Sequence, residues 1–417
     1  MKSRVNISKS FSVNCEVYLL LISFILSIGT SFFDSSLYYT ATVGLLILMI
    51  GVYFLTTKNT RIDKKLLCVL CIMLVVLGYN YLLSPLATKK LLVHLSCFLM
   101  GCILFSNGKE HGLNQLLKGY SIILSISAIY GVFEFIFGNI FDAYTVRVYA
   151  ATYRLHSLFL HPIIFSLILL QSLIINHYLI KNVIVKGILT LINIFCIFMS
   201  LSRSSWLVLG IILIMMMIHQ KYIQKKPLLV SKYITKVRFL GIAVLLCVIV
   251  IIIQKLDIVS YLGTLMTRWQ ALEGSMSVQY RLSVIASVFS DRINDTNIFH
   301  WLIGSGYHSV QASVANAALG FATLGNYVVD NEWISIFFDF GFIGLAALVY
   351  LTIKSLRCYF GNYDSSLWIV SLCMIANLLM ALICDTFGWA PAGNVVFVLS
   401  GILFSVSKKD LKDEVIV

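Results

Sequence analysis

Long apolar runs recur along the whole chain and are separated by mostly short polar segments. A bilayer core offers no water to the backbone, so each run of roughly 17–25 apolar residues must satisfy its amides internally, as a helix. Hydrophobic residues make up 59% of the chain and charged residues 12%, which is too little charge to cover a soluble domain. The sequence therefore predicts an all-α integral membrane protein, a bundle of about 12 transmembrane helices in a single polytopic domain over residues 1–417.

One large polar loop interrupts this pattern, at about residues 255–333, between the ninth and tenth spans. The expected spans are 15–31, 37–55, 66–83, 91–105, 120–137, 160–180, 184–199, 201–219, 239–253, 334–353, 367–383 and 391–406. A polar interval of this length between two spans is a natural place for function, because loops carry binding and catalytic residues more often than packed elements do.

The distribution of Lys and Arg predicts the orientation of the chain. With the N-terminus in the cytoplasm, 22 of the 31 Lys and Arg residues fall on the cytoplasmic side. Both termini are then cytoplasmic and the large loop faces outward. The formal net charge of +13 is thus a topology signal, and it predicts no nucleic-acid partner.

Cysteines and metal-binding motifs offer little chemistry. Nearly all of the ten cysteines fall inside or at the edge of apolar runs, which argues against a disulfide framework. No metal-ligand spacing and no phosphate-binding P-loop is present, so we expect neither a metal site nor a cofactor.

The residues on the outer side include six arginines. Lys and Arg usually gather on the cytoplasmic side, so arginines on the outer side need an explanation. Arginine presents a planar fork that binds phosphate with two hydrogen bonds. Arg203 lies in the segment Ser202–Trp206, at the outer junction of two apolar runs. This segment is either a functional site or a short polar turn in which Trp206 anchors the interface.

Two further outer segments combine charge with aromatic residues or glycine. Arg154 precedes His161-Pro162 among several tyrosines, a pattern that suits interfacial anchoring or the binding of sugar and phosphate. Arg281 precedes the turn-like segment that contains Gly304, Gly306 and His308, where the glycines permit a tight loop. A lone G-x-G is weak support for phosphate binding.

Carboxylates open the tenth span, in Asp330-Asn331-Glu332-Trp333. An acid at a helix N-terminus is stabilising as a cap. A carboxylate at the membrane surface is also able to act as a general base towards a sugar hydroxyl. Both interpretations stay open at this stage.

Taken together, these segments resemble the O-antigen polymerase (Wzy-type) and O-antigen ligase family of bacterial envelope glycosyltransferases. The resemblance rests on the order of the segments, the predicted spans and the late outer loop. Its members act on sugars linked to undecaprenyl diphosphate, at the periplasmic face of the bacterial inner membrane. It therefore implies a metal-independent glycosyltransferase without a cofactor.

The resemblance also implies roles for particular residues. Arg203 and Arg281 would hold the donor diphosphate, and Asp330 would be the catalytic base. The remaining candidates would bind substrate: Arg154, His161, Trp206, Gly304, Gly306, His308, Asn331 and Glu332. Ligases of this family commonly have a His-Asn pair where this chain has Asp330-Asn331, and this departure favours a polymerase.

The expected function is polymerisation of O-antigen or related repeat units, with undecaprenyl-diphosphate-linked oligosaccharides and membrane lipid as partners. A chain-length regulator and a flippase are further partners that the resemblance implies. The nearest alternative is an O-antigen ligase that transfers the chain to lipid A-core. An alternative of another class is a flippase or transporter of lipid-linked sugars, which the absence of a clear internal repeat disfavours.

Overall fold

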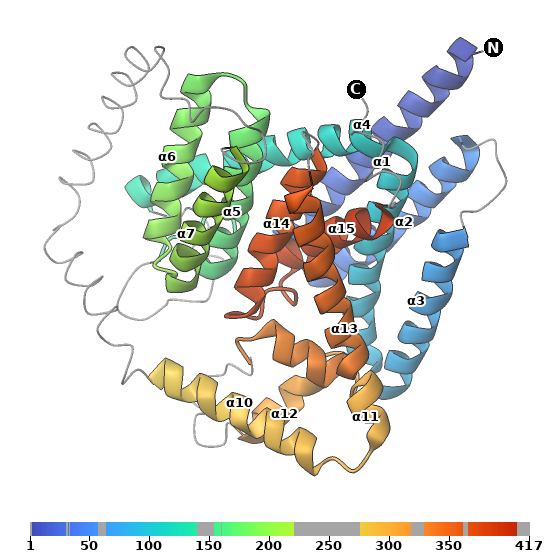
Figure 1. Ribbon diagram of the computed structural model, residues 1–417, viewed down its shortest axis with the longest axis vertical. Coiled ribbons are helices and arrows are strands. Elements are labelled where there is room, and N and C mark those ends of the chain that lie inside the picture. Colours follow the sequence, from blue (N-terminus) through green and yellow to red (C-terminus); the bar gives the residue numbers. More distant parts are fainter. Residues whose placement is uncertain are drawn as a thin grey trace, which may run out of the picture.

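The chain is helical wherever its structure is described. The computed structural model describes residues 2–30, 32, 34–56, 64–138, 140, 154–159, 161–220, 276–317, 329–361 and 366–406. Within these ranges the chain forms helices, with no β-strand (Figure 1). All cysteines in the described ranges are free thiols, as the sequence predicts.

Four helices form the N-terminal part of the bundle. They are α1 (Lys2–Gly29), α2 (Ser35–Thr56), α3 (Lys64–Leu83) and α4 (Pro85–Phe137). Helix α4 replaces two expected spans and the loop between them with one continuous helix, which changes direction near the end of the bundle (Figure 1). The connecting segment includes three glycines, which are poor helix formers. Two of them let α4 pack closely against α1, because a Cβ atom at Gly112 would lie 3.0 Å from Val13 Cγ1 and one at Gly119 would lie 2.4 Å from Leu21 Cδ1.

A second group begins with α5 (Pro162–Leu179), α6 (Val183–Met199) and α7 (Arg203–Ile218). His161 caps α5, and its Nδ1 accepts a hydrogen bond from the Ile163 N–H at 3.3 Å. Asn182 caps α6 in the same way. Near the C-terminal end of the chain, α13 (Glu332–Phe360), α14 (Ser366–Ala381) and α15 (Ala390–Ser405) complete the bundle.

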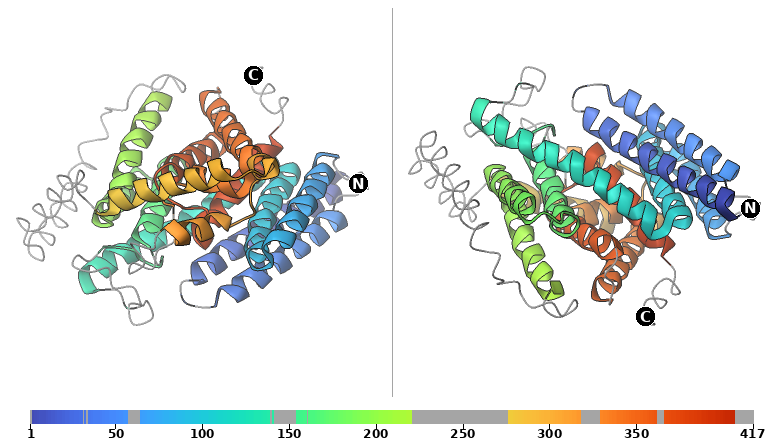
Figure 2. Two further views of the ribbon diagram at one scale, coloured as in Figure 1. Left: turned by 90° about the horizontal axis from the view of Figure 1, so that it is seen from below. Right: turned by 90° about the horizontal axis from the view of Figure 1, so that it is seen from above.

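The described part of the polar interval, residues 276–317, folds into helices that cover one end of this bundle, and residues 255–275 and 318–328 of the interval lie outside the described residues. These are α10 (Met276–Asn294), α11 (Ile298–Ile303) and α12 (Ser309–Ala317). Figure 2 shows α10 lying across the end of the bundle. The start of α1 and the α5–α6 connection lie at the opposite end (Figure 1). This arrangement agrees with an N-terminus and a polar loop on opposite sides of a membrane.

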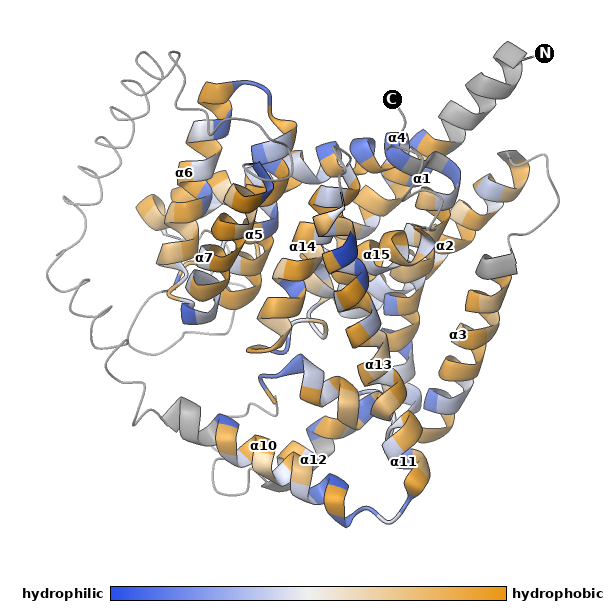
Figure 3. Cartoon of the chain, viewed as in Figure 1, coloured by the Kyte–Doolittle hydropathy of each residue, from blue (hydrophilic) through white to orange (hydrophobic). Residues whose placement is uncertain are grey.

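Apolar residues dominate the bundle helices (Figure 3). In the described part of the chain, five segments are long and apolar enough to cross a membrane: Ser35–Leu55, Ala87–Asn107, Glu110–Phe137, Pro162–Leu179 and Glu332–Phe360. Six shorter apolar helices accompany them, at Val13–Gly29, Leu67–Leu83, Val183–Met199, Arg203–Ile218, Ser366–Ala381 and Ala390–Ser405. These segments coincide with eleven of the expected spans, and the span expected at 239–253 lies outside the described residues.

Helix α15 packs closely against α4. A Cβ atom at Gly101 would lie 2.2 Å from the Val398 carbonyl oxygen, and one at Gly401 would lie 2.0 Å from that of Phe98. Small residues at such contacts let two membrane helices approach closely. Near the outer end of α15, a Cβ atom at Gly393 would lie 2.8 Å from Cε1 of His94 in α4. This contact holds the start of α15, and with it the loop of residues 382–389, beside the outer half of α4.

Candidate functional site

The α14–α15 loop (residues 382–389) is where several of the predicted site residues meet. Its backbone is tightly folded, because the Cys384 N–H donates to the Met380 carbonyl at 2.9 Å and the Trp389 N–H donates to that of Thr386 at 3.3 Å. The loop presents Cys384, Asp385 and Trp389 to neighbouring helices. Its neighbours come from α4, α5, α7 and α13, which are far apart in the sequence.

Arg281 and Asp330 form an ion pair, with Nε of Arg281 2.8 Å from Oδ2 of Asp330. Their side chains are 32% and 30% exposed, so solvent reaches both. Asp330 has a backbone φ of 54°, in the left-handed region that residues other than glycine rarely adopt. Strained backbone of this kind clusters at functional sites. Two of the three predicted catalytic residues are therefore in direct contact.

Asn331 and Glu332 join α13 to the α14–α15 loop. The Asn331 side chain caps α13, and its Nδ2 donates to the Leu382 carbonyl oxygen at 2.9 Å. Glu332 is 6% exposed, and its Oε2 accepts from the backbone N–H groups of Thr386 and Phe387, each at 2.9 Å. Both residues thus position the loop, and their predicted contact with substrate stays a prediction.

The α6–α7 turn that contains Arg203 also reaches this loop. Ser204 Oγ lies 3.6 Å from the Cys384 Sγ. Burial raises the pKa of the Cys384 thiol to about 11, and the charges of Asp330 and Arg281 also act on it. The turn and the Arg281–Asp330 pair therefore lie near the same residue. Arg203 begins α7 at this turn.

Arg154 and Trp206 support the same turn from outside. Arg154 Nε donates to the Ser200 carbonyl oxygen at 3.0 Å. Trp206 Nε1 donates to the Ile197 carbonyl at 3.2 Å, and its ring packs against Phe198. Through these contacts the two side chains hold the turn in place.

His161 is brought to the other end of the α14–α15 loop. Its ring centroid lies 5.0 Å from that of Trp389, the residue that precedes α15. Since His161 also caps α5, its ring is fixed by both neighbours. The structure thus gathers His161 at the same loop as Asn331 and Glu332.

Gly304 and Gly306 have a packing role. Both have positive φ, 80° and 98°, and the N–H of Gly306 donates to the Asp339 carbonyl at 3.0 Å. A Cβ atom at Gly304 would lie 2.1 Å from the same oxygen. Helix α13 is kinked there at Gly341, which has a φ of 61°. The glycine segment therefore docks backbone-to-backbone against this kink, and phosphate binding by it stays a prediction.

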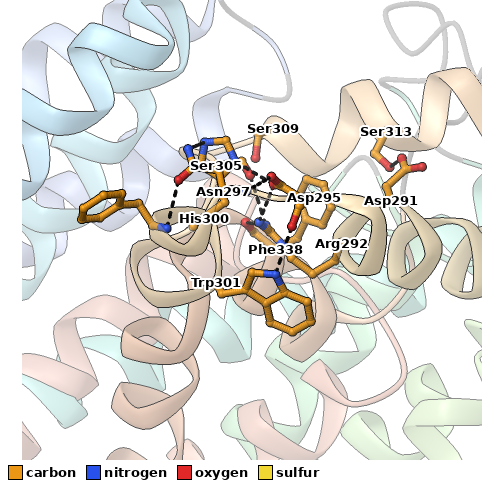
Figure 4. Close-up of polar contacts among 12 residues, drawn as sticks. Asp291, Arg292, Asp295, Asn297, His300, Trp301, Ser305, Ser309, Ser313 and Phe338 are labelled. Carbon is orange, nitrogen blue, oxygen red and sulfur yellow. Dashed lines mark hydrogen bonds and ion pairs between the residues drawn. The ribbon is translucent and has the colours of Figure 1, made fainter.

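A buried arginine, absent from the predicted site, locks this contact (Figure 4). Arg292 is 1% exposed, and its Nη2 donates to Ser305 Oγ at 3.1 Å and to the Phe338 carbonyl at 2.5 Å. Its Nη1 lies 3.3 Å from the Asp295 carboxylate. Arg292 thus fastens α10 to the kink in α13.

His308 faces α4. Its Nε2 lies 3.3 Å from Lys90 Nζ, and its backbone N–H donates to the Asp339 carboxylate at 2.7 Å. Burial and the Lys90 charge lower the pKa of His308 to about 4, although Asp385 opposes this. His308 is therefore neutral at pH 7 and is able to accept a hydrogen bond from the Lys90 ammonium group.

Sequence reasoning missed the α14–α15 loop and Lys90 as parts of the site. The signal was present, because Cys384-Asp385-Thr386 and Gly388-Trp389 interrupt an apolar sequence on the expected outer side. Among the described residues, no group of three His, Cys, Asp or Glu side chains is placed to hold a metal ion. Metal independence remains a prediction from the family.

The fold and the site define a multi-pass helical membrane protein with a polar cluster at one end of its bundle. A protein-family model described as O-antigen ligase matches residues 188–349. This match bears out the predicted resemblance to the O-antigen polymerase and ligase family over these residues, and it supports a glycosyltransferase-type activity. The matched segment includes Arg203, Arg281 and Asp330. No curated protein sequence matches the chain.

The Glu332 contacts give a stability prediction. Glu332→Ala leaves the buried N–H groups of Thr386 and Phe387 without their acceptor, which costs about 2 kcal/mol or more. We expect a lower melting temperature for the purified protein in detergent. Glu110→Ala, at an exposed position on α4, is the control and should melt as wild type. Equal melting temperatures for the two variants would show that Glu332 does not hold the loop.

Proposed function

We propose that this protein polymerises lipid-linked oligosaccharide repeat units of O-antigen or a related surface polysaccharide at the periplasmic face of the inner membrane. The growing chain on undecaprenyl diphosphate is the donor, and a repeat unit on a second carrier is the acceptor. The observation that carries the proposal is the contact of Arg281 with Asp330 beside the loop that Ser204 also reaches. The family match supports the same type of activity.

In this proposal the arginines act on the leaving group. Arg203 and Arg281 bind the donor diphosphate and stabilise the negative charge that develops as its bond to the sugar breaks. Preorganised cations contribute most at such a site, because they need no rearrangement during the reaction. Arg281 also holds Asp330, so it places the base next to the reacting sugar.

Asp330 is the proposed general base. Its carboxylate takes the proton from the terminal hydroxyl of the acceptor, and the hydroxyl oxygen forms a bond to the anomeric carbon of the donor. The bond from that carbon to the phosphate oxygen breaks, and undecaprenyl diphosphate leaves with the electron pair. Attack opposite the leaving group inverts the anomeric carbon, as expected from the family.

Lipopolysaccharide profiles of a deletion strain test the function. If the protein is the polymerase, the deletion should accumulate lipid A-core bearing one repeat unit, because ligation survives. The description of the matched family as O-antigen ligase makes the ligase the second candidate. A ligase deletion would instead leave the core bare, with long chains remaining on undecaprenyl diphosphate.

A reaction with purified protein separates an enzyme from a transporter. Protein in detergent, given lipid-linked repeat units as both donor and acceptor, should produce longer lipid-linked chains. A flippase would produce no longer chains, because it forms no glycosidic bond. In detergent there is also no membrane across which it could move a lipid. Asp330→Asn should make far less product, by a factor of about 10²–10⁴.

A further inference from the structure

An apolar cavity opens beside the predicted site, between α3, α4, α13 and α15. Its volume is about 660 Å³, within the range of roughly 300–1,000 Å³ that small-molecule sites occupy. Val75, Leu91, Ile343 and Val396 line its apolar part. Ile343 is 62% exposed and Val75 is 72% exposed, so the walls reach the surface that would face lipid. A hydrocarbon chain is therefore able to pass between the cavity and the bilayer.

One end of the cavity adjoins the predicted site. Tyr307 and Glu332 line it together with the apolar residues, and so does Phe387 of the α14–α15 loop. Glu332 and Phe387 are already joined by the hydrogen bond described above. The cavity thus leads from the lipid-facing surface to the predicted site.

Lys90 places a positive charge near the end of the cavity that adjoins the predicted site. It precedes the cavity residue Leu91 on α4, and its Nζ contacts His308, which follows the cavity residue Tyr307. Among the described residues, no carboxylate lies within ion-pair distance of Lys90, although Asp385 and Glu332 act on it electrostatically. Since His308 is neutral at pH 7, the Lys90 charge stays available to an anionic ligand.

Two cationic positions therefore lie near the α14–α15 loop. One is Arg281, which acts on Cys384, and the other is Lys90, which interacts with Asp385. An arginine fork suits a diphosphate whose charge grows as it departs. A lysine is a compact point charge that also binds phosphate. With the donor diphosphate assigned to Arg203 and Arg281, Lys90 is the cationic position left for the phosphate of a second carrier.

We infer that the cavity between α3, α4, α13 and α15 binds part of the polyprenyl chain of the acceptor carrier, and that Lys90 contacts its phosphate. This inference rests on the proposed function, because a polymerase of this kind uses two lipid carriers. It adds a place for the second carrier and a residue, Lys90, that holds it. The donor would then occupy the side of Arg203 and Arg281.

Binding of undecaprenyl phosphate to the purified full-length protein tests the cavity. Ala347→Trp fills it, since Ala347 is part of its lining, and Ala346→Trp is the neighbouring control outside the lining. Lys90→Gln removes the charge, and Lys89→Gln removes an adjacent exposed charge. Both test variants should bind about tenfold more weakly or worse, while both controls should bind as wild type. The Lys90 variant keeps the test decisive if the tryptophan variant fails to fold.

Two outcomes would overturn the cavity as a lipid site. One is wild-type binding by both test variants. The other is complete displacement of the lipid by inorganic diphosphate at equal concentration, because the apolar cavity would then contribute nothing. Both outcomes are measured by lipid binding and not by polymerisation. The inference about the cavity can therefore be wrong while the proposed function is right, and the reverse.

Kinetics test the assignment to the acceptor. Lys90→Gln should raise the KM for the acceptor roughly tenfold and leave the KM for the donor unchanged. A raised KM for the donor alone would overturn the assignment. Lys89→Gln is again the control.

Discussion

Arg281→Ala is expected to lower the rate of polymerisation by a factor of about 10²–10³, the usual cost of removing one group that stabilises charge in a transition state. The loss should fall mainly on kcat, because the diphosphate charge grows as the bond to the sugar breaks. Arg281→Lys restores the charge without the fork and should recover only part of the rate. Purified protein with defined donor and acceptor gives both constants.

Arg357→Ala is a matched control for this experiment. Arg357 is an exposed arginine near the C-terminal end of α13, on the expected cytoplasmic side. This variant should polymerise as wild type. If Arg281→Ala also keeps the wild-type kcat/KM, Arg281 does not act on the donor diphosphate.

A double-mutant cycle tests whether Arg281 and Asp330 work as a unit. Their side chains are in contact at 2.8 Å, so the effects of Arg281→Ala and Asp330→Asn should not add. The double variant should be little worse than the poorer single variant. Additive losses would mean that the two residues contribute independently of each other.

Gly341→Ala is expected to cost the largest amount of stability, about 3 kcal/mol or more. Gly341 has a φ of 61° and a ψ of −154° inside α13, a conformation that alanine rarely adopts. A Cβ atom would also lie 2.6 Å from the Trp301 carbonyl oxygen and 2.7 Å from the Gly304 nitrogen. The variant should therefore lose the docking of α11 on α13, and it should express poorly and melt at a lower temperature.

Gly187→Ala is the matched control for Gly341. It lies within α6, and a Cβ atom there would meet nothing within 4 Å. Alanine is the better helix former, so this variant should be as stable as wild type or more stable. A Gly341→Ala protein with a wild-type melting temperature would show that the kink tolerates a side chain.

The sequence predicted the helical architecture well because the signal is local. A run of apolar residues long enough for a membrane is visible without knowledge of the rest of the chain. The continuity of α4 was missed because the polar residues and the three glycines at 106–119 indicate a loop. Gly112 and Gly119 pack against Val13 and Leu21 of α1, so tertiary packing outweighs the weak helix propensity there.

The candidate site was only partly predictable because its contacts are not local. Arg281 and Asp330 are 49 residues apart, and Asn331 and Leu382 are 51 apart. Sequence identified Arg281, Asp330 and Asn331 as site candidates from their chemistry. It had no means to place the α14–α15 loop beside them, because the loop meets Asn331 and Glu332 through backbone groups.

The Gly304–Gly306 segment shows how one motif supports two interpretations. Its glycines suggested close approach of the backbone to a ligand. In the structure the backbone approaches α13 instead, where the Ser305 N–H donates to the Phe338 carbonyl at 3.1 Å. The requirement for glycine was correctly identified, and the partner was missed.

The position of the α14–α15 loop has a consequence for how the protein is made. A ribosome delivers the chain from its N-terminus, so Arg203, Arg281 and Asp330 are all synthesised before residues 382–389. Until α14 and α15 enter the membrane, Asn331 and Glu332 lack the backbone groups with which they pair. A nascent chain thus carries every residue of the proposed catalytic set before the loop that Asn331 and Glu332 bind has been made. If the loop is needed for the proposed reaction, we expect activity to begin only when membrane insertion is nearly complete.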